Sequence, residues 1–173
     1  MPKQMQMLRK TNWLFLIIIS CFLITSCDSK AVFDVYKPLP NQWHKDSVAS
    51  FNFKAPDTIS NYNLYVNLRN NSDYKFSNLF LIVEINYPNG KAVTDTLEYK
   101  MAAPNGELLG TGFSDIKENK LWFRGFKKPF KFNEEGDYIV YIQHVMRNNG
   151  DVNGIDNLEG ITDVGFRVEQ AQN

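Results

Sequence analysis

The sequence predicts an all-β fold, an antiparallel β-sandwich of about eight strands with a jelly-roll-like arrangement. Three observations support this prediction. Short segments with period-two hydrophobic alternation recur along the chain, and turn residues separate them. An Asn-Gly pair lies between two such segments, which is the strongest short-range sign of a β-hairpin. No window shows a convincing 3.6-residue apolar period, as an amphipathic helix would.

The residues before Cys27 are typical of a bacterial lipoprotein signal peptide, which we assign to residues 1–26. Basic residues precede a nearly unbroken apolar run over residues 13–23, which is too short for a membrane-spanning helix. An aliphatic residue and two small residues then lead to Cys27. We predict cleavage before Cys27 and acylation of this residue, with palmitate as a typical fatty acid. The alternative is an ordinary signal peptide, or an anchor helix, with an incidental cysteine.

Cleavage leaves a lipidated tether over residues 27–30, followed by one β-sandwich domain over residues 31–173. The tether is short, so we expect the domain to lie close to a membrane of the cell envelope, inner or outer. Three of the 19 basic residues and none of the 19 acidic residues lie before Cys27. The mature chain therefore has a net charge of about −3, which disfavours nucleic acid as a partner. Cys21 leaves with the signal, so the domain has neither a free thiol nor a disulfide.

The predicted strands follow one another with short turns between most of them. Residues 62–69 alternate strictly between apolar and polar side chains, which indicates a half-buried strand. Residues 79–87 are apolar on one face and partly on the other, which predicts a central strand; the turn at Asn89-Gly90 then returns the chain. Phe51 and Phe53 would be buried from an earlier strand. The full set of predicted strands is 31–36, 48–54, 62–69, 79–87, 92–99, 121–125, 137–147 and 164–169.

Two long irregular segments, residues 102–119 and 148–163, connect predicted strands and are rich in Gly and Asn. Long loops on a rigid scaffold often carry function, so we predict a partner-binding surface at the second loop. Its candidate residues are Met146, Arg147, Ile155 and Leu158. The three-residue spacing of Ile155, Leu158 and Ile161 suggests a single helical turn. The alternative is that these apolar residues only plug the end of the core.

The chain offers little for catalysis, so we expect no enzyme and no cofactor. His44 lies in a polar loop, and His144 shares a strand face with Ile142 and Met146, which favours a packed or hydrogen-bonded histidine. No serine lies in a G-x-S-x-G motif. Asn149, Asp151 and Asn153 resemble the start of an EF-hand loop, but the position of the bidentate glutamate is occupied by glycine. We therefore predict no metal site.

Aromatic residues leave a second binding function open. Exposed rings of Tyr65, Trp43 or Trp122 would suit a glycan, provided that they are coplanar and line a groove; buried rings would favour an adaptor protein. A mixed basic and aromatic segment could also bind sugars, lipids or nucleic acid. The favoured explanation is a strand with Pro129 in the middle and its charges in solvent, because Glu134 and Glu135 largely cancel the local charge. The residues of this segment are Arg124, Phe126, Lys127, Lys128, Phe130, Lys131 and Phe132.

A set of short motifs occurs in a fixed order along the chain. The motifs are Arg69-Asn70, Tyr74, Asn78-Leu79, Gly110, Gly112, Gly136-Asp137-Tyr138, Gln143, Met146-Arg147, Gly160-Ile161 and Asp163-Val164-Gly165. Together with the lipoprotein signal, this set resembles the GldH family of gliding motility lipoproteins from the Bacteroidota. The resemblance implies a cell-envelope lipoprotein needed for gliding on surfaces, a process tied to type IX secretion, and it implies no catalytic residues. Family members also occur in bacteria that do not glide.

Three Asp-(Ser/Thr)-apolar triplets resemble the general O-glycosylation motif of exported Bacteroidota proteins. The candidate sites are Ser47, Thr58 and Thr96, and a bulky glycan there requires hydroxyls that face solvent. The alternative is ordinary turn and strand chemistry.

The sequence thus favours a non-enzymatic adaptor or scaffold, anchored by lipid, that docks on other envelope proteins of the gliding and secretion machinery. A glycan-binding lipoprotein is the second hypothesis, and an enzyme is the third.

Overall fold

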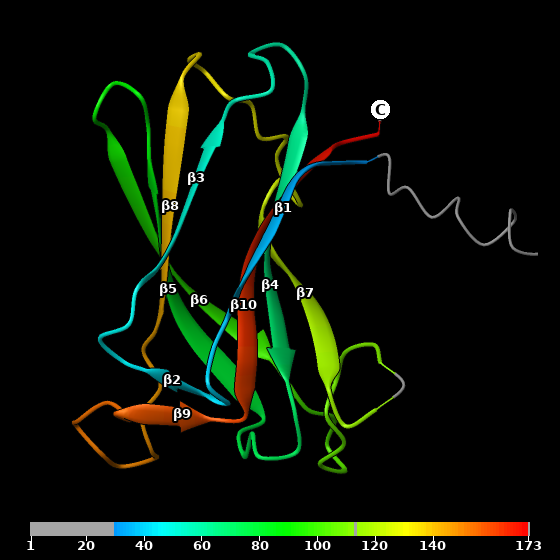
Figure 1. Cartoon of the computed structure of the whole chain (residues 1–173), viewed down its shortest axis with the longest axis vertical. Coiled ribbons are helices and arrows are strands. Elements are labelled where there is room, and N and C mark those ends of the chain that lie inside the picture. The colour runs from blue at the N-terminus through cyan, green and yellow to red at the C-terminus, as the bar shows by residue number, and fades with distance from the viewer. Residues whose placement is uncertain (1–29, 113, 173) are drawn as a thin grey trace, which may run out of the picture.

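The computed structural model describes residues 30–112 and 114–172, and these residues form two antiparallel sheets that face each other (Figure 1). The predicted signal peptide and Cys27 lie outside the described residues. One sheet has the order β1-β10-β4-β7 and the other the order β3-β8-β5-β6. A short pair, β2 with β9, closes one end. The bounds are β1 Ala31–Pro38, β2 Gln42–His44, β3 Ala49–Lys54, β4 Tyr62–Asn70, β5 Asn78–Asn86, β6 Ala92–Lys100, β7 Lys117–Arg124, β8 Asp137–His144, β9 Asn157–Glu159 and β10 Ile161–Gln170.

The strand order confirms an all-β sandwich and is that of a jelly roll. The chain passes from one sheet to the other at almost every connection between the eight longer strands, and only the β5–β6 hairpin stays within one sheet. A jelly roll of eight strands contains two Greek keys. The hairpin turns at Asn89-Gly90, where Gly90 adopts a positive φ of 83°.

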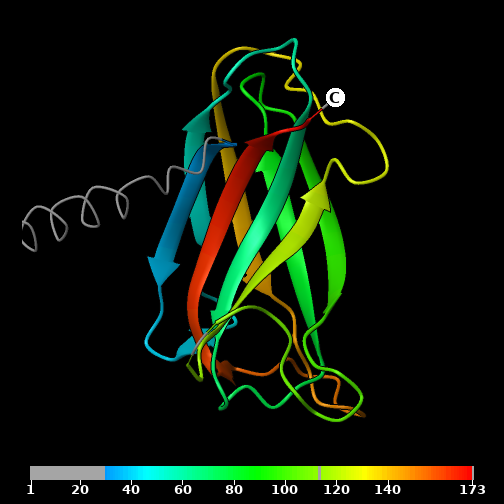
Figure 2. The ribbon, with the colours of Figure 1, turned by 90° about the vertical axis from the view of Figure 1, so that its right-hand side faces the viewer.

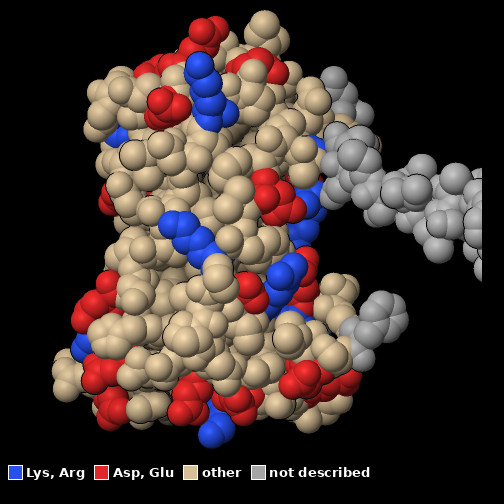
Figure 3. All heavy atoms as spheres, viewed as in Figure 1, with Lys and Arg blue, Asp and Glu red and all other residues tan. Residues whose placement is uncertain are grey.

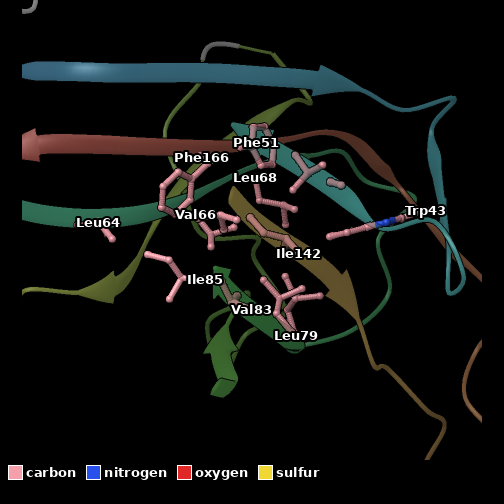
Figure 4. Packing of buried hydrophobic residues seen from close by; sticks show 14 of the residues in the cluster. Trp43, Phe51, Leu64, Val66, Leu68, Leu79, Val83, Ile85, Ile142 and Phe166 are labelled. Atoms are coloured by element: carbon pink, nitrogen blue, oxygen red, sulfur yellow. The ribbon is translucent and has the colours of Figure 1, made fainter. Parts of the chain in front are cut away.

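The core lies between the inward faces of the two sheets (Figure 4). The burial of β5 alternates strictly along the strand, and its inward side chains are fully buried. Those of β4 and β10 meet them from the other sheet. β5 lies between β8 and β6, which confirms that residues 79–87 form a central strand. The inward residues of these three strands are Leu64, Val66, Leu68, Leu79, Leu81, Val83, Ile85, Val164, Phe166 and Val168.

Several predicted boundaries differ from the structure. β7 begins at Lys117, inside a predicted loop, because it pairs with β4 down to Asn70. β8 ends at His144, before the predicted end at residue 147. The prediction of a helical turn through Ile155, Leu158 and Ile161 is wrong, because residues 157–159 form β9 and pair with β2. These two strands are three residues each, too short to show a period in the sequence.

Gly160 forms the corner between β9 and β10, and the corner requires a residue without a side chain. Its φ is +79°, in the left-handed region that favours glycine. A Cβ atom there would lie 2.2 Å from the backbone nitrogen of Tyr74. The Gly160 amide donates to the carbonyl of Asn41, and its carbonyl accepts from Asn71, both at 2.9 Å. The corner therefore joins three loops at one end of the sandwich.

Substituting this corner should destabilise the protein. Gly160→Ala is expected to lower the free energy of unfolding by at least about 2 kcal/mol, because left-handed strain and a backbone clash act together. The matched control is Gly154→Ala, whose new Cβ would meet the carbonyl of Met146 at 3.4 Å, an ordinary contact, without a positive φ. Urea denaturation of both variants measures the difference. Equal stability of the two variants would contradict the requirement for glycine at position 160.

Candidate partner-binding surface

The loops of the sandwich gather at two opposite ends. The terminal end, as we call it, comprises Lys30, the C-terminus and loops 55–61, 87–91 and 125–136 (Figures 1 and 2). The distal end comprises loops 39–48, 71–77, 101–112 and 145–156 together with β2 and β9. The strand registers fix this division, because Ala31 pairs with Glu169 at one end of β10 and Pro38 with Asp163 at the other.

Two adjoining hollows lie at the distal end, where the outer face of the β3-β8-β5-β6 sheet meets loop 147–154. Their volumes are about 520 and 600 Å³, and both are lined by Phe80, Met146 and Arg147. The first also reaches Val145 and Val152. We call the two together the distal hollow. The sheet contributes Phe80 as its apolar residue, Val145 and Met146 directly follow β8, and loop 147–154 forms the wall.

The loop beside the distal hollow is held by its own hydrogen bonds. The Ile155 amide donates to the Met146 carbonyl at 2.8 Å and closes the base of the loop. Nearer the tip, the Asp151 amide donates to the Asn148 carbonyl at 3.1 Å, and the Asn148 side chain returns a bond to the Asp151 carboxylate at 3.1 Å. Val152 is 93% exposed. The loop therefore presents an apolar side chain to solvent from a defined backbone.

The structure places the four predicted partner-surface residues in different environments. Arg147 is exposed and Ile155 is half-buried, packed against the core. Leu158 and Met146 belong to the core cluster itself. Leu158 pairs with Trp43 in the β2–β9 ladder, and the Met146 sulfur lies 3.1 Å from the amide nitrogen of Phe80. For these two residues the structure favours the core-plug alternative.

Sequence reasoning missed Phe80 and Val152 as surface candidates. Phe80 is an outward residue of a strand whose other face is buried, and its carbonyl accepts the Val145 amide at 3.0 Å. The sequence did carry a signal, since the second face of residues 79–87 is partly apolar. Val152 stands alone among polar loop residues, without a periodic pattern to mark it.

Acidic side chains gather around the distal end, as the lower part of Figure 3 shows. Some are paired, for example Asp156 with Lys45 at 2.6 Å and Glu159 with Lys75 at 3.8 Å. The rim of the distal hollow itself carries both charges, with Lys45 and Arg147 next to Asp46 and Asp151. The exposed acidic residues are Asp46, Asp73, Glu107, Asp115, Asp151, Asp156 and Glu159.

His144 lies beneath the distal hollow and is buried against Trp43. Its Nε2 lies 2.9 Å from the Trp43 carbonyl, and the two rings meet edge to face with centroids 5.6 Å apart. Because a carbonyl only accepts, Nε2 carries the proton of the neutral ring. Burial lowers the pKa of His144, and the bond to the Trp43 carbonyl opposes this shift only in part. The side chain is therefore a neutral, packed histidine.

The tryptophans do not form the platform that glycan binding would need. Trp43 is fully buried and donates from Nε1 to the Ser47 carbonyl at 2.7 Å. Trp122 is 38% exposed, and its ring is tilted by 47° against Tyr65 and by 50° against Phe126. Coplanar rings along one groove are thus not found among these residues.

The hydroxyls proposed for O-glycosylation reach the surface to different degrees. Ser47 and Thr96 are exposed, and Thr58 is half-buried. Thr96 lines the distal hollow. Modification of these residues stays a prediction.

Within residues 30–112 and 114–172, no group of three or more His, Asp or Glu side chains is arranged to hold a metal ion.

Comparison with known proteins identifies the family. A family model described as GldH lipoprotein matches residues 31–168. The chain belongs to the GldH lipoprotein family. The gliding motility lipoprotein GldH homolog of Christiangramia forsetii is 52% identical over 96% of this chain and 100% of that protein. The gliding motility lipoprotein GldH of Flavobacterium johnsoniae is 50% identical over 90% of this chain and 94% of that protein.

Membership of the GldH lipoprotein family implies a lipid-anchored location in the cell envelope. No helix in the part of the chain that the structure describes is long and apolar enough to cross a membrane.

Among solved structures, infectious bursal disease virus, Gx strain, aligns with 85% of this chain and 34% of that chain at 15% identity. The TM-score is 0.39, and this likeness carries no argument about function.

The buried histidine of this GldH family member should make its stability depend on pH. The folded protein binds the His144 proton more weakly than the unfolded chain, so protonation favours unfolding. Stability is expected to be constant above about pH 6.5 and to fall from there towards pH 5, by at most about 1.4 kcal/mol per pH unit. The conservative variant His144→Gln should lose this slope, which urea denaturation at a series of pH values measures. If the stability of the variant fell with pH as steeply as that of the unchanged protein, His144 would not be the cause of the pH dependence.

Proposed function

We propose that this chain is a non-enzymatic, lipid-anchored adaptor of the gliding motility machinery, including its type IX secretion components, and that it binds another envelope protein through the distal hollow. Two relatives at about half identity carry the name gliding motility lipoprotein. The observation that carries the proposal is a preformed hollow beside a fixed, exposed loop at the end of the sandwich opposite Lys30.

The position of the distal hollow supports a role in reaching a partner. The chain enters the sandwich at Lys30, three residues after the predicted lipidation site. β10 runs the length of the sandwich over 10 residues, which places the distal end roughly 30 Å from the terminal end. A lipid on Cys27 thus leaves the distal hollow accessible to proteins away from the membrane surface.

The composition of the distal hollow supports recognition of a protein side chain. Phe80 and Val145 supply an apolar floor, and Val152 supplies an apolar wall. Arg147, Lys45 and Asp46 form a polar rim. An apolar centre within a polar rim is the usual anatomy of an interface, and a hollow of this size accommodates one large anchor residue. The partner expected here inserts an apolar or aromatic side chain and meets the mixed charges of this rim with polar residues around it.

The hydrogen bonds of loop 147–154 also reduce the cost of binding. The loop is closed at its base and braced near its tip, so little backbone freedom is lost when a partner arrives. Binding residues on an ordered loop above a rigid sheet are a common arrangement.

Removing the exposed side chains of this surface should weaken binding without unfolding the protein. Val152→Ser combined with Arg147→Ala is expected to weaken partner binding about tenfold, measured as recovery of envelope proteins with the tagged lipoprotein from detergent extracts. The free energy of unfolding should change by less than about 0.5 kcal/mol, because both residues are exposed.

The matched control is Ile59→Ser, which removes an equally exposed apolar residue from the terminal end. It should leave recovery unchanged in detergent. Two outcomes would contradict binding at the distal hollow. The double variant would recover as much envelope protein as the unchanged lipoprotein, or its lower recovery would be explained by a lower melting temperature.

Anchoring is tested at Cys27 itself. Cys27→Ser should leave unprocessed precursor or soluble protein, because several acyl chains at about 0.8 kcal/mol per buried CH₂ would be lost. Cys21→Ser changes the other cysteine of the chain and should be processed normally. Membrane fractionation with labelled fatty acid measures both. A Cys27→Ser protein of mature size that still incorporates the label would overturn the assignment.

A further inference from the structure

Two of the most exposed large apolar side chains lie on two loops of the terminal end. Ile59 is 81% exposed on loop 55–61, and Phe126 is 71% exposed on loop 125–136. Figure 2 shows the second loop, in yellow, projecting at the end where the C-terminus lies. Neither side chain contributes to the core cluster. Both therefore present apolar surface to whatever the terminal end faces.

Hydrogen bonds to the Asp57 carboxylate fix the backbone of loop 55–61 around the exposed Ile59. The Asp57 carboxylate accepts the amides of Ile59 and Ser60, at 2.8 and 2.6 Å, and the hydroxyl of Tyr62 at 2.5 Å. These bonds keep the carboxyl charged and lower its pKa, with the Ser60 amide as the largest cause. The exposure of Ile59 is thus a built feature of the loop.

Phe126 is supported by a short stack of rings. Its centroid lies 5.2 Å from that of Trp122, and Trp122 in turn lies 4.5 Å from Tyr65 on β4. Gly125, with a φ of +104°, lets the chain turn closely over Asn63 and Tyr62. The ring therefore projects from an anchored base.

Backbone hydrogen bonds join both loops to the point where the chain enters the sandwich. The Tyr62 amide donates to the Phe130 carbonyl at 2.8 Å, and the Ala171 amide donates to the Asn61 carbonyl at 2.9 Å. The Gln170 amide then donates to the Lys30 carbonyl at 3.1 Å. Lys30, Ile59 and Phe126 consequently share one end of the molecule.

Three lysines lie on the same loop as Phe126. Lys127, Lys128 and Lys131 are exposed, and none of them forms an ion pair with any described residue. Loop 125–136 also carries Glu134 and Glu135, and Glu134 is hydrogen-bonded by the Asn89 side chain. The Asp57 carboxylate beside Ile59 is occupied by its own hydrogen bonds.

We propose that Ile59 and Phe126, with Lys127, Lys128 and Lys131, form a second contact with the anionic lipid surface to which the chain is anchored. The contact rests on the lipid anchorage of the proposed function. Residues 27–30 reach at most about 14 Å when extended, so the anchor holds the terminal end within range of the headgroups. The anchor thus keeps the side chains at a high effective concentration near the lipid, and even a weak contact with the lipid forms under this condition.

The chemistry of the patch suits a bilayer interface. A phenyl ring and an aliphatic side chain enter the boundary between headgroups and acyl chains, and lysines remain among the phosphates. Each lysine near an anionic surface strengthens the contact about fivefold. The contact orients the sandwich upright, and the distal hollow then faces away from the membrane.

Lipid quenching of single reporters tests the contact in the full lipoprotein. Phe126→Trp and Val152→Trp are each made in a Trp122→Phe background, so that one reporter marks each end. The buried Trp43 remains as a constant signal in both. The proteins are reconstituted in phosphatidylcholine–phosphatidylglycerol vesicles with headgroup-level nitroxide lipid. Strong quenching at position 126 and little at position 152 is expected.

A second set of changes separates the contact from the anchor. Ile59→Ser with Lys127→Glu and Lys128→Glu, in the Phe126→Trp protein, should abolish most of the quenching. Flotation with the vesicles should persist, because the lipid still holds the chain. Equal quenching of the two reporters, absent quenching at position 126, or quenching that survives the triple change would each overturn the proposal. A wild-type protein that fails to float would overturn the anchorage itself, and this contact with it.

Discussion

The contact between two central strand pairs, β10–β4 in one sheet and β8–β5 in the other, positions the rest of the molecule. Their inward side chains are fully buried, and each contributes about 1.5–3 kcal/mol relative to an exposed position. Because side chains alternate along a strand, this inward set also fixes the outward set. Phe80 reaches the distal hollow for that reason: Leu79 and Leu81, on either side of it, are held in the core.

The antiparallel sandwich separates the loops into two ends with different chemistry. The terminal end carries unpaired lysines and two exposed apolar side chains beside the entry of the chain. The distal end carries acidic side chains and a hollow with an ordered loop. The proposed adaptor role uses this difference, with one end facing the membrane and the other facing a partner. The long strands provide the distance between them.

Trp43 and His144 show how the distal end is closed. The two side chains come from β2 and β8, pack edge to face and share a hydrogen bond from the His144 ring to the Trp43 carbonyl. β9 adds Leu158 across the ladder from Trp43. Trp43 thus belongs to the plug that supports the distal hollow, and is unavailable as a binding platform for sugars.

The sequence by itself determined the properties that depend on neighbouring residues. Alternation identified the main strands and their inward faces, Asn89-Gly90 identified the hairpin, and the residues up to Cys27 indicated the signal. Only the tertiary structure decided the rest. Leu158 and Val152 are both apolar residues in a polar stretch, but pairing with β2 buries Leu158 and the loop exposes Val152. That the loops of Ile59 and Phe126 lie at one end likewise depends on the pairing of Tyr62 with Phe130, because contacts between distant segments follow from the fold and leave no local pattern.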